Sequence, residues 1–363
     1  MPKADPYFIE AAAKVLDILA LFGEHDEIRL KDVMSRLGLV KSTAFRFLYT
    51  LEQKGAIERT PGGLSYRRVR RHRIGFVSIS NDIPFVAEVE RGIEREAARN
   101  GIELILRHHR FDSAALLAQV DELLASDIRL LLCYNPDEYV SHVLADRCAN
   151  QRVPVVAITF PVPGARVFGV NNYRAGVVGG EGLGEHIARR WSGVLDRAVV
   201  LDIPGSSPAQ GARITGMVEG LRTRVDLPEE RILHLHPDRR TSTAEVAMRE
   251  VLQAKGRPGR IAVLCYNDLN ALGALRAVEA AGRTNDVAIL SQGGVAEVRE
   301  HVRRPRSAMW GAVAHFPERF GQGLIPVLLR LLRGETIPAA TYTEHVLLTR
   351  SNIARYYPVP ERD

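Results

Sequence analysis

Residues 40–55 read VKSTAFRFLYTLEQKG and combine two kinds of helix surface. One is an apolar stripe of residues at helical spacing, Ala44, Phe47, Leu48 and Leu51. The other carries hydroxyls, a guanidinium and two aromatic rings, from Ser42, Phe45, Arg46 and Tyr49. A helix face that only meets water is expected to carry mainly residues such as Glu and Lys. The second face therefore predicts a surface that binds another molecule.

The positive charge of the chain is concentrated around this helix. Residues 36–73 hold ten Lys/Arg and two Asp/Glu, whereas residues 1–35 hold four and seven. The rest of the chain is nearly balanced, although the whole chain has a formal net charge of +6. A concentrated basic surface attracts a polyanion. A solvated basic face without a partner is the alternative.

Three helices and a hairpin are predicted in this part of the chain. The first helix covers roughly residues 8–22, and the second lies in RLKDVMSRLGL. Gly38 then allows a sharp turn, and the third helix begins at Lys41–Ser42. Two short extended pieces follow Gly55 and flank a hairpin tip at 61–63. This order predicts a winged helix-turn-helix over residues 1–66, followed by a basic linker, 67–73.

A winged helix-turn-helix places its third helix in the major groove of double-stranded DNA. There Arg46 can pair with guanine, and Phe45 can pack on a thymine methyl group. Hydroxyls and N–H groups at the start of the helix can meet phosphates or base edges. The predicted DNA-binding residues are Lys41, Ser42, Thr43, Phe45, Arg46, Tyr49, Arg59, Arg67, Arg68, Arg70 and Arg71. A winged helix that contacts another protein is the alternative.

Residues 8–68 resemble the N-terminal domain of the isocitrate-lyase-regulator (IclR) type of bacterial repressor. The resemblance is carried by AAAKVLDILALFGEHDEIRLKDVMSRLGLVKSTAFRFLYTLEQKGAIER, most specifically by GLVKSTAFRFLYTLEQKG. It implies a dimeric repressor or activator that binds a DNA operator. The effector domain usual in that family does not follow here, so its ligands are not implied.

From Arg73 onward, apolar strand segments alternate with helical segments. Examples are RIGFVSIS, IRLLLCY, VPVVAITF, AVVLDIP, IAVLCYND and VAILSQGG. Such alternation predicts parallel sheets that helices cover on both faces, with ligands at the carboxyl ends of the strands. The length fits two sheets of this kind.

This part of the chain, about 74–358, resembles the ribose-binding-protein fold as used by the lac/gal repressor (LacI/GalR) family. The most specific stretch is YNDLNALGALRAVEAAG, supported by GARITGMVEGL and AVAHFPERFGQ. The predicted fold class is therefore α/β, with an N-terminal winged helix-turn-helix and a two-lobed periplasmic-binding-protein-like domain of two doubly wound parallel sheets. We expect this domain to span 74–363. The first lobe is expected at about 74–172 and 295–320, and the second at about 173–294 and 321–363.

The second resemblance implies a small polar, carbohydrate-like effector held by loops at the strand ends. The positions that match the family's ligand sites are Asp82, Phe85, Thr159, Phe160, Arg213, Asn267, Gln292 and His315. At two sites the sequence departs from the family pattern. Thr159–Phe160 stands where sugar binders commonly have Asp-Arg, and Gln292 is the nearest candidate for a missing acidic residue. The pocket therefore has fewer groups for charge-assisted hydrogen bonds.

Each of these positions also has a structural alternative. Phe85 and Phe160 can be core residues, and His315 can be a hydrogen-bonded core histidine. Asn267 can cap a loop, and Arg213 can pair with Glu219 on its own helix. The glycines Gly179, Gly180, Gly182 and Gly184 lack the spacing of a dinucleotide-binding loop and lie inside a predicted helix, so they favour close helix packing.

The leading hypothesis is a transcription regulator whose DNA affinity is set by a small effector, with no cofactor and no metal. A transporter's binding component would need an export signal, but FIEAAAKVLDILALFG is interrupted by charges in helical rhythm. We therefore expect a cytoplasmic protein without membrane contact. A metabolite-binding protein with a protein-contacting winged helix, or an enzyme, is the alternative; no catalytic motif is seen. One winged helix covers few base pairs, so a homodimer is expected.

Overall fold

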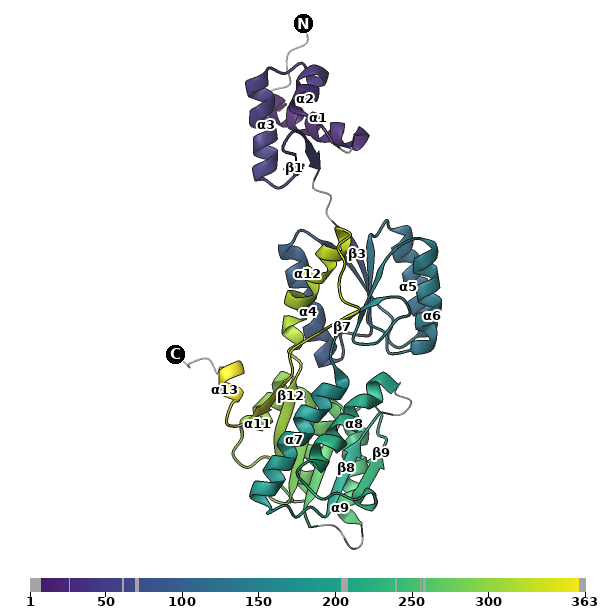
Figure 1. Ribbon diagram of the computed structural model, residues 1–363, viewed down its shortest axis with the longest axis vertical. Helices are drawn as coiled ribbons and strands as arrows, with labels where there is room; N and C mark the ends of the chain where they lie inside the picture. Colours follow the sequence, from purple (N-terminus) through teal and green to yellow (C-terminus); the bar gives the residue numbers. More distant parts are fainter. Residues whose placement is uncertain are drawn as a thin grey trace. The chain divides into compact units, whose positions relative to one another are not determined.

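The computed structural model describes residues 8–25, 27–60, 62–68, 72–203, 208–238, 240–254, 256 and 259–358. The chain divides into two compact units, 1–71 and 72–363 (Figure 1). This division falls within the predicted basic linker. No helix in the described part of the chain is both long and apolar enough to cross a membrane.

The first unit is a winged helix-turn-helix. Its elements are α1 (Glu10–Glu24), α2 (Leu30–Leu37), α3 (Lys41–Gln53), β1 (Ile57–Arg59) and β2 (Tyr66–Arg68), the two strands being antiparallel. Gly38 ends α2 at φ 62°, a left-handed conformation that glycine adopts without strain. The core is apolar and includes Ile18, Val33 and Leu48. The predicted helix-turn-helix is confirmed.

The structure changes the predicted start of the linker. Arg67 and Arg68 lie on β2, where they pair with Glu58 and Ile57 of β1. They therefore belong to the wing, because the hairpin ladder continues for two residues beyond Tyr66. Arg70 and Arg71 lie outside the described residues.

The first lobe of the second unit is built on a parallel sheet with strand order β13-β7-β6-β5-β3-β4. Its strands are β3 (Arg73–Ser78), β4 (Glu103–His108), β5 (Leu130–Cys133), β6 (Val155–Ile158), β7 (Arg166–Gly169) and β13 (Ala340–Tyr342). One face is covered by α4 (Pro84–Arg99) and α12 (Phe320–Leu332), and the other by α5 (Ser113–Ala125) and α6 (Glu138–Asn150) (Figure 1). Continuous apolar strands such as Leu130–Cys133 suit this arrangement because both of their faces are buried.

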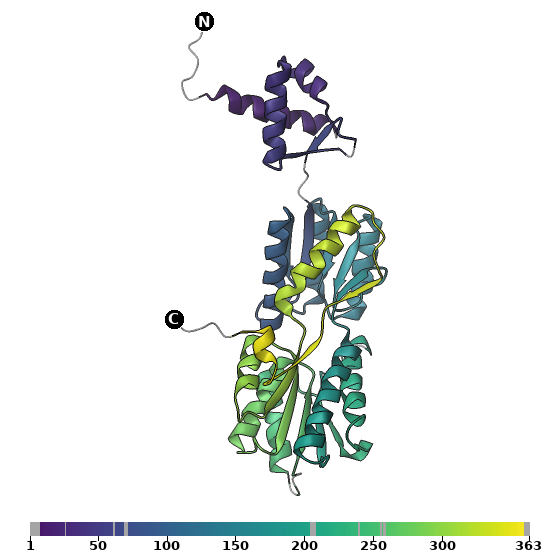
Figure 2. The same cartoon turned by 60° about the vertical axis from the view of Figure 1, so that its left-hand side comes forward.

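The second lobe has the strand order β14-β12-β11-β10-β8-β9, in which only β14 is antiparallel to its neighbour. Its strands are β8 (Arg197–Leu201), β9 (Ile232–Leu235), β10 (Ile261–Cys265), β11 (Val287–Gly293), β12 (Met309–Ala314) and β14 (Val346–Thr349). Its helices are α7 (Asn172–Arg190), α8 (Pro208–Arg222), α9 (Thr241–Gln253), α10 (Asp268–Ala280), α11 (Ala296–Arg303) and α13 (Ile353–Tyr356). Figure 2 shows the two lobes from another side. The predicted pair of doubly wound sheets is confirmed.

The predicted limits of the lobes need correction at the C-terminal end. Residues 296–314 form α11 and β12 of the second lobe, whereas α12 and β13 return to the first. The reason is packing: Gly321 of α12 lies against the backbone of Gly92 in α4, so closely that a Cβ there would overlap the Gly92 carbonyl. Strand alternation gives the order of elements along the chain but not which sheet receives them.

Candidate functional site

The second face of α3 is exposed, whereas its apolar stripe is buried. Ala44, Leu48 and Leu51 are buried in the core. Phe45 and Tyr49 are 43% and 50% exposed, and their rings stack with centroids 6.3 Å apart. These residues are four positions apart, so the rings lie one above the other on the helix surface. In the described part of the first unit, no helix or strand covers this face, which carries both polar and aromatic groups.

The start of α3 is not capped by the side chain of its N-cap residue. The helix begins at Lys41, and its N-cap residue, Val40, provides no side-chain hydrogen bond. Lys41 and Ser42 are exposed, and Thr43 is half-buried. The first N–H groups of a helix carry partial positive charge and suit a phosphate oxygen.

The wing carries arginines that form only exposed ion pairs or lie exposed on the surface. Arg59 pairs with Glu52 at 3.1 Å, and Arg67 pairs with Glu58 at 2.6 Å, in exposed settings. Arg68 is exposed on β2. Exposed ion pairs contribute little stability, so phosphate can replace these carboxylates at small cost.

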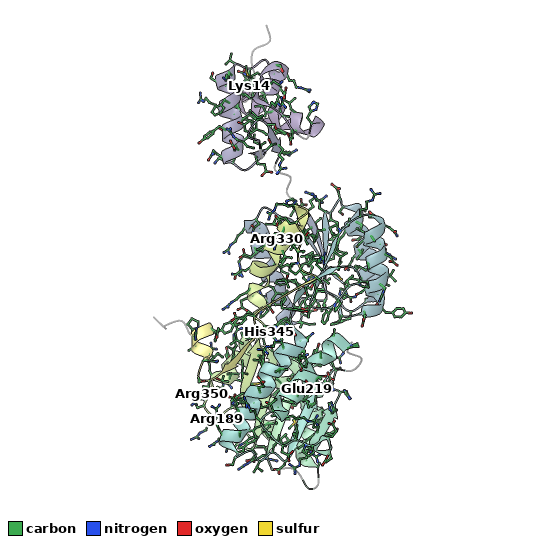
Figure 3. The ribbon with its side chains drawn as sticks, viewed as in Figure 1. Lys14, Arg189, Glu219, Arg330, His345 and Arg350 are labelled. Atoms are coloured by element: carbon green, nitrogen blue, oxygen red, sulfur yellow. The ribbon has the colours of Figure 1, made fainter. Side chains whose placement is uncertain are left out.

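The second unit contains a cavity of about 340 Å³ between its two lobes. It is lined by loops that follow the carboxyl ends of strands from both sheets, as expected for parallel α/β sheets. The lobes are joined by crossovers at 170–171, 315–319 and 343–345. His345, on the third crossover, accepts the Asn171 N–H of the first at 3.1 Å, and its ring lies 5.7 Å from that of His315 on the second (Figure 3).

Seven of the eight predicted effector residues line this cavity. They are Phe85, Thr159, Phe160, Arg213, Asn267, Gln292 and His315. Asp82 is not in the lining and needs correction. Its side chain is exposed and accepts the Ser80 hydroxyl at 2.8 Å, because a short turn satisfies the carboxylate locally.

Arg213 is 7% exposed and is held from two sides. Its Nε and Nη2 donate to Asn172 Oδ1 at 3.0 and 2.6 Å, and Nη1 donates to the Tyr266 carbonyl at 2.8 Å. The guanidinium lies 4.6 Å from the centre of the Tyr266 ring. The alternative pairing with Glu219 does not form, because that carboxylate accepts the Tyr173 hydroxyl at 2.6 Å on the helix surface (Figure 3).

Gln292 and His315 form a neutral pair at the cavity. The ring Nε2 of His315 donates to Gln292 Oε1 at 3.0 Å, and the Gln292 amide donates to the Ala175 carbonyl at 3.2 Å. Burial holds the pKa of His315 well below its usual range, and the positive charge of Arg213 lowers it further. The imidazole is therefore neutral at pH 7. His315 is both a hydrogen-bonded core histidine and part of the cavity wall.

The aromatic wall comes mainly from the first lobe. Phe160 stacks on Tyr134 with centroids 5.6 Å apart, and Phe85 meets the His315 ring edge-on at 6.0 Å. Asn267 caps α10 by accepting the Asn270 N–H at 2.9 Å while also lining the cavity. Phe85, Phe160 and Asn267 therefore have the packing and capping roles of the structural alternative and also line the cavity.

The cavity residues that were not predicted include Tyr134, Tyr266 and Asp268. A signal for the tyrosines exists, because Cys-Tyr-Asn follows the strand in both lobes, at 133–135 and 265–267. Asp268 accepts the Ser291 hydroxyl and the N–H groups of Gly294 and Val295. Burial raises its pKa, and these hydrogen bonds oppose that rise. No group of three or more His, Cys, Asp or Glu residues in the described chain is placed to hold a metal ion.

Comparison with known proteins agrees with this architecture. A periplasmic binding protein domain model matches residues 74–336, and an IclR helix-turn-helix domain model matches residues 11–61. The chain belongs to the periplasmic binding protein domain family and carries an IclR-type helix-turn-helix domain at its N-terminal side.

Relatives include both transport and regulatory proteins. The ribose import binding protein of Salmonella typhimurium is 28% identical over 280 residues, covering 76% of this chain and 90% of that protein. The HTH-type transcriptional repressor PurR of Proteus mirabilis is 26% identical over 296 residues, covering 77% and 80%. A solute-binding protein from Actinobacillus succinogenes with bound D-allose has a similar fold, with TM-score 0.69, 18% identity, and coverage of 79% of this chain and all of that one.

Proposed function

We propose that this protein is a sequence-specific DNA-binding transcription regulator of LacI/GalR-like design, controlled by a small polar effector such as a sugar or sugar derivative. The observation that carries the proposal is that one chain has both an exposed α3 face in its first unit and, in its second unit, a cavity with polar groups from both lobes. The proposal includes a cytoplasmic location, no cofactor, no catalytic activity and no membrane partner.

The cavity provides a physical means of control. A ligand that contacts Thr159 in the first lobe and Arg213 in the second stabilises the arrangement in which both reach it. Such a ligand binds one arrangement of the lobes more tightly than the other. Only a difference in ligand affinity between the two arrangements can change DNA binding. The direction of regulation, repression or activation, depends on which arrangement binds the operator.

The direct experiment is a binding titration of the full chain with DNA from upstream of its own gene, with and without candidate sugars. Specific binding that changes on sugar addition supports the proposal. Sugar binding with no preference for any DNA would instead support the alternative, a metabolite-binding protein whose winged helix contacts another protein.

Replacing Arg46 with alanine should weaken specific operator binding by roughly 1–3 kcal/mol and relax base choice at one position per half-site. The side chain lies on the exposed face of α3 beside Phe45. Competition titrations against single-base operator variants measure both effects. Full retention of operator preference would show that α3 does not read the sequence.

Arg68→Ala is the matched control, since it removes the same side chain from the exposed wing. We expect weaker binding to all DNA sequences alike and a salt slope smaller by about one unit. The same behaviour is expected for Arg67, Arg70 and Arg71. Loss of operator binding alone, at an unchanged salt slope, would contradict this role.

We expect a homodimer on a pseudo-palindromic operator. Two-fold symmetry doubles the number of base pairs that one winged helix can read. Light scattering on the free protein and on its operator complex measures the stoichiometry. A monomer in the free protein, together with one chain per operator in the complex, would contradict this expectation.

A further inference from the structure

Arg213 is a buried cation with hydrogen-bonding capacity left over. Its guanidinium has five N–H bonds, and the described contacts to Asn172 and Tyr266 use three of them. Both acceptor atoms, Asn172 Oδ1 and the Tyr266 carbonyl oxygen, are neutral. Within the described residues, Arg213 forms no ion pair at 4.0 Å or less, although buried charges in proteins are normally paired.

One carboxylate of the cavity wall is buried and already satisfied. Asp268 is 6% exposed and accepts from Ser291 Oγ at 2.5 Å, Gly294 N at 3.1 Å and Val295 N at 3.0 Å. These bonds fix the carboxylate toward the β11–α11 loop. It influences Arg213 through space but does not occupy its free N–H bonds.

Several other polar groups of the cavity wall are uncharged. Asn267, Gln292, His315 and Thr159 offer amide, imidazole and hydroxyl groups to the cavity. Two further carboxylates, Glu88 and Glu297, line the cavity from α4 and α11. Neither of them forms an ion pair with Arg213 at 4.0 Å or less among the described residues.

We infer that the effector of the proposed regulator carries a carboxylate, and that Arg213 receives it. The ligand class is a small hydroxy acid of sugar size, such as an aldonic or uronic acid. A guanidinium binds a carboxylate in a planar, charge-assisted arrangement that a neutral hydroxyl does not reproduce. The hydroxyls of the ligand face Asn267 and Gln292, and its carbon skeleton lies against the Tyr134–Phe160 stack and Phe85.

This inference rests on the proposed function, but its test separates the two. The probes are the aldonates of ribose, arabinose, glucose and galactose, the corresponding uronates where they exist, and for each the neutral aldose and alditol. Calorimetry and thermal shift on the full chain measure affinity at fixed ionic strength. We expect at least one acid to bind at least tenfold more tightly than its aldose and alditol.

Two variants separate the charge from the fold. Arg213→Gln keeps an amide donor but removes the charge, and should reduce the preference for acid over alditol toward one. Arg213→Lys keeps the charge and should retain part of that preference. The melting temperature of each free variant reports whether the second unit is still folded, and a variant that fails to fold leaves the wild-type comparison to decide.

The outcomes are distinct. Binding of a neutral sugar as tight as that of its acid, or no binding of any acid at concentrations up to about 10 mM, would overturn the carboxylate inference. A neutral sugar that shifts operator affinity would overturn it while supporting the proposed function. An acid that binds selectively without changing operator affinity would support the ligand class and count against the proposed regulation.

Discussion

Replacing Arg213 with alanine should abolish the change in operator affinity on effector addition, while the free protein still binds DNA nearly as well as the wild type. In the wild type we expect saturating effector to change operator affinity roughly 5- to 150-fold, the usual range of coupling between two sites. The reason is that Arg213 lies in the cavity wall of the second lobe and is absent from the DNA-binding unit. Removing it deletes the second lobe's charged contact with the ligand.

The measurement is an operator titration of each protein with and without saturating effector. Arg222→Ala is a matched control, because Arg222 lies on the same helix, pairs with Glu229 and is not part of the cavity wall. It should retain the full response. A response in Arg213→Ala equal to that of the wild type would place the effector site elsewhere.

The sequence predicted the DNA-binding unit in detail because its signals are local. Helical spacing alone separated Ala44, Leu48 and Leu51 from the exposed Phe45 and Tyr49. The hairpin differed only in length, since a ladder can continue past the residue where a pattern ends. The contact of this unit with DNA stays a prediction.

The ligand cavity was predicted less completely because it depends on tertiary contacts. Thr159 and His315 follow strand ends and meet Arg213 of α8 in one cavity, as expected for parallel sheets. Asp82 does not line the cavity, and its carboxylate accepts a local hydrogen bond from Ser80. Residue spacing does not predict this hydrogen bond. Thr159 also has a left-handed backbone, at φ 65°, that is uncommon for threonine and arises from the fold around it.

The glycines of α7 show where a sequence pattern predicted packing correctly. Gly180 and Gly184 lie against α8, and a Cβ on Gly180 would overlap the Met217 carbonyl. Gly179 and Gly182 lie instead against side chains of the sheet, including Leu290 and Leu347. The facing helix contributes glycines of its own, at 216 and 220, which the pattern of α7 alone did not indicate. Close backbone approach therefore requires glycine on both helices.

Replacing Gly216 with alanine should lower the free energy of unfolding of the second unit by about 1–3 kcal/mol. An added Cβ would overlap the Tyr173 carbonyl and lie 3.0 Å from Val177 N, so backbone of α7 would have to move. This cost exceeds the gain of up to about 1 kcal/mol that alanine gives over glycine in a helix.

Gly211→Ala makes the same substitution on the same helix, where the new Cβ meets no described atom within 4 Å. It should leave stability unchanged or raise it by up to about 1 kcal/mol. Trp191 and Trp310 are the two tryptophans of the chain, and both lie in the second unit, so urea titration followed by tryptophan fluorescence reports on that unit. Equal midpoints for the two variants would mean that α7 and α8 do not need glycine at their contact. A lower midpoint for Gly216→Ala alone would tie the glycine pattern to the helix pair that carries Arg213 of the cavity wall and its partner Asn172.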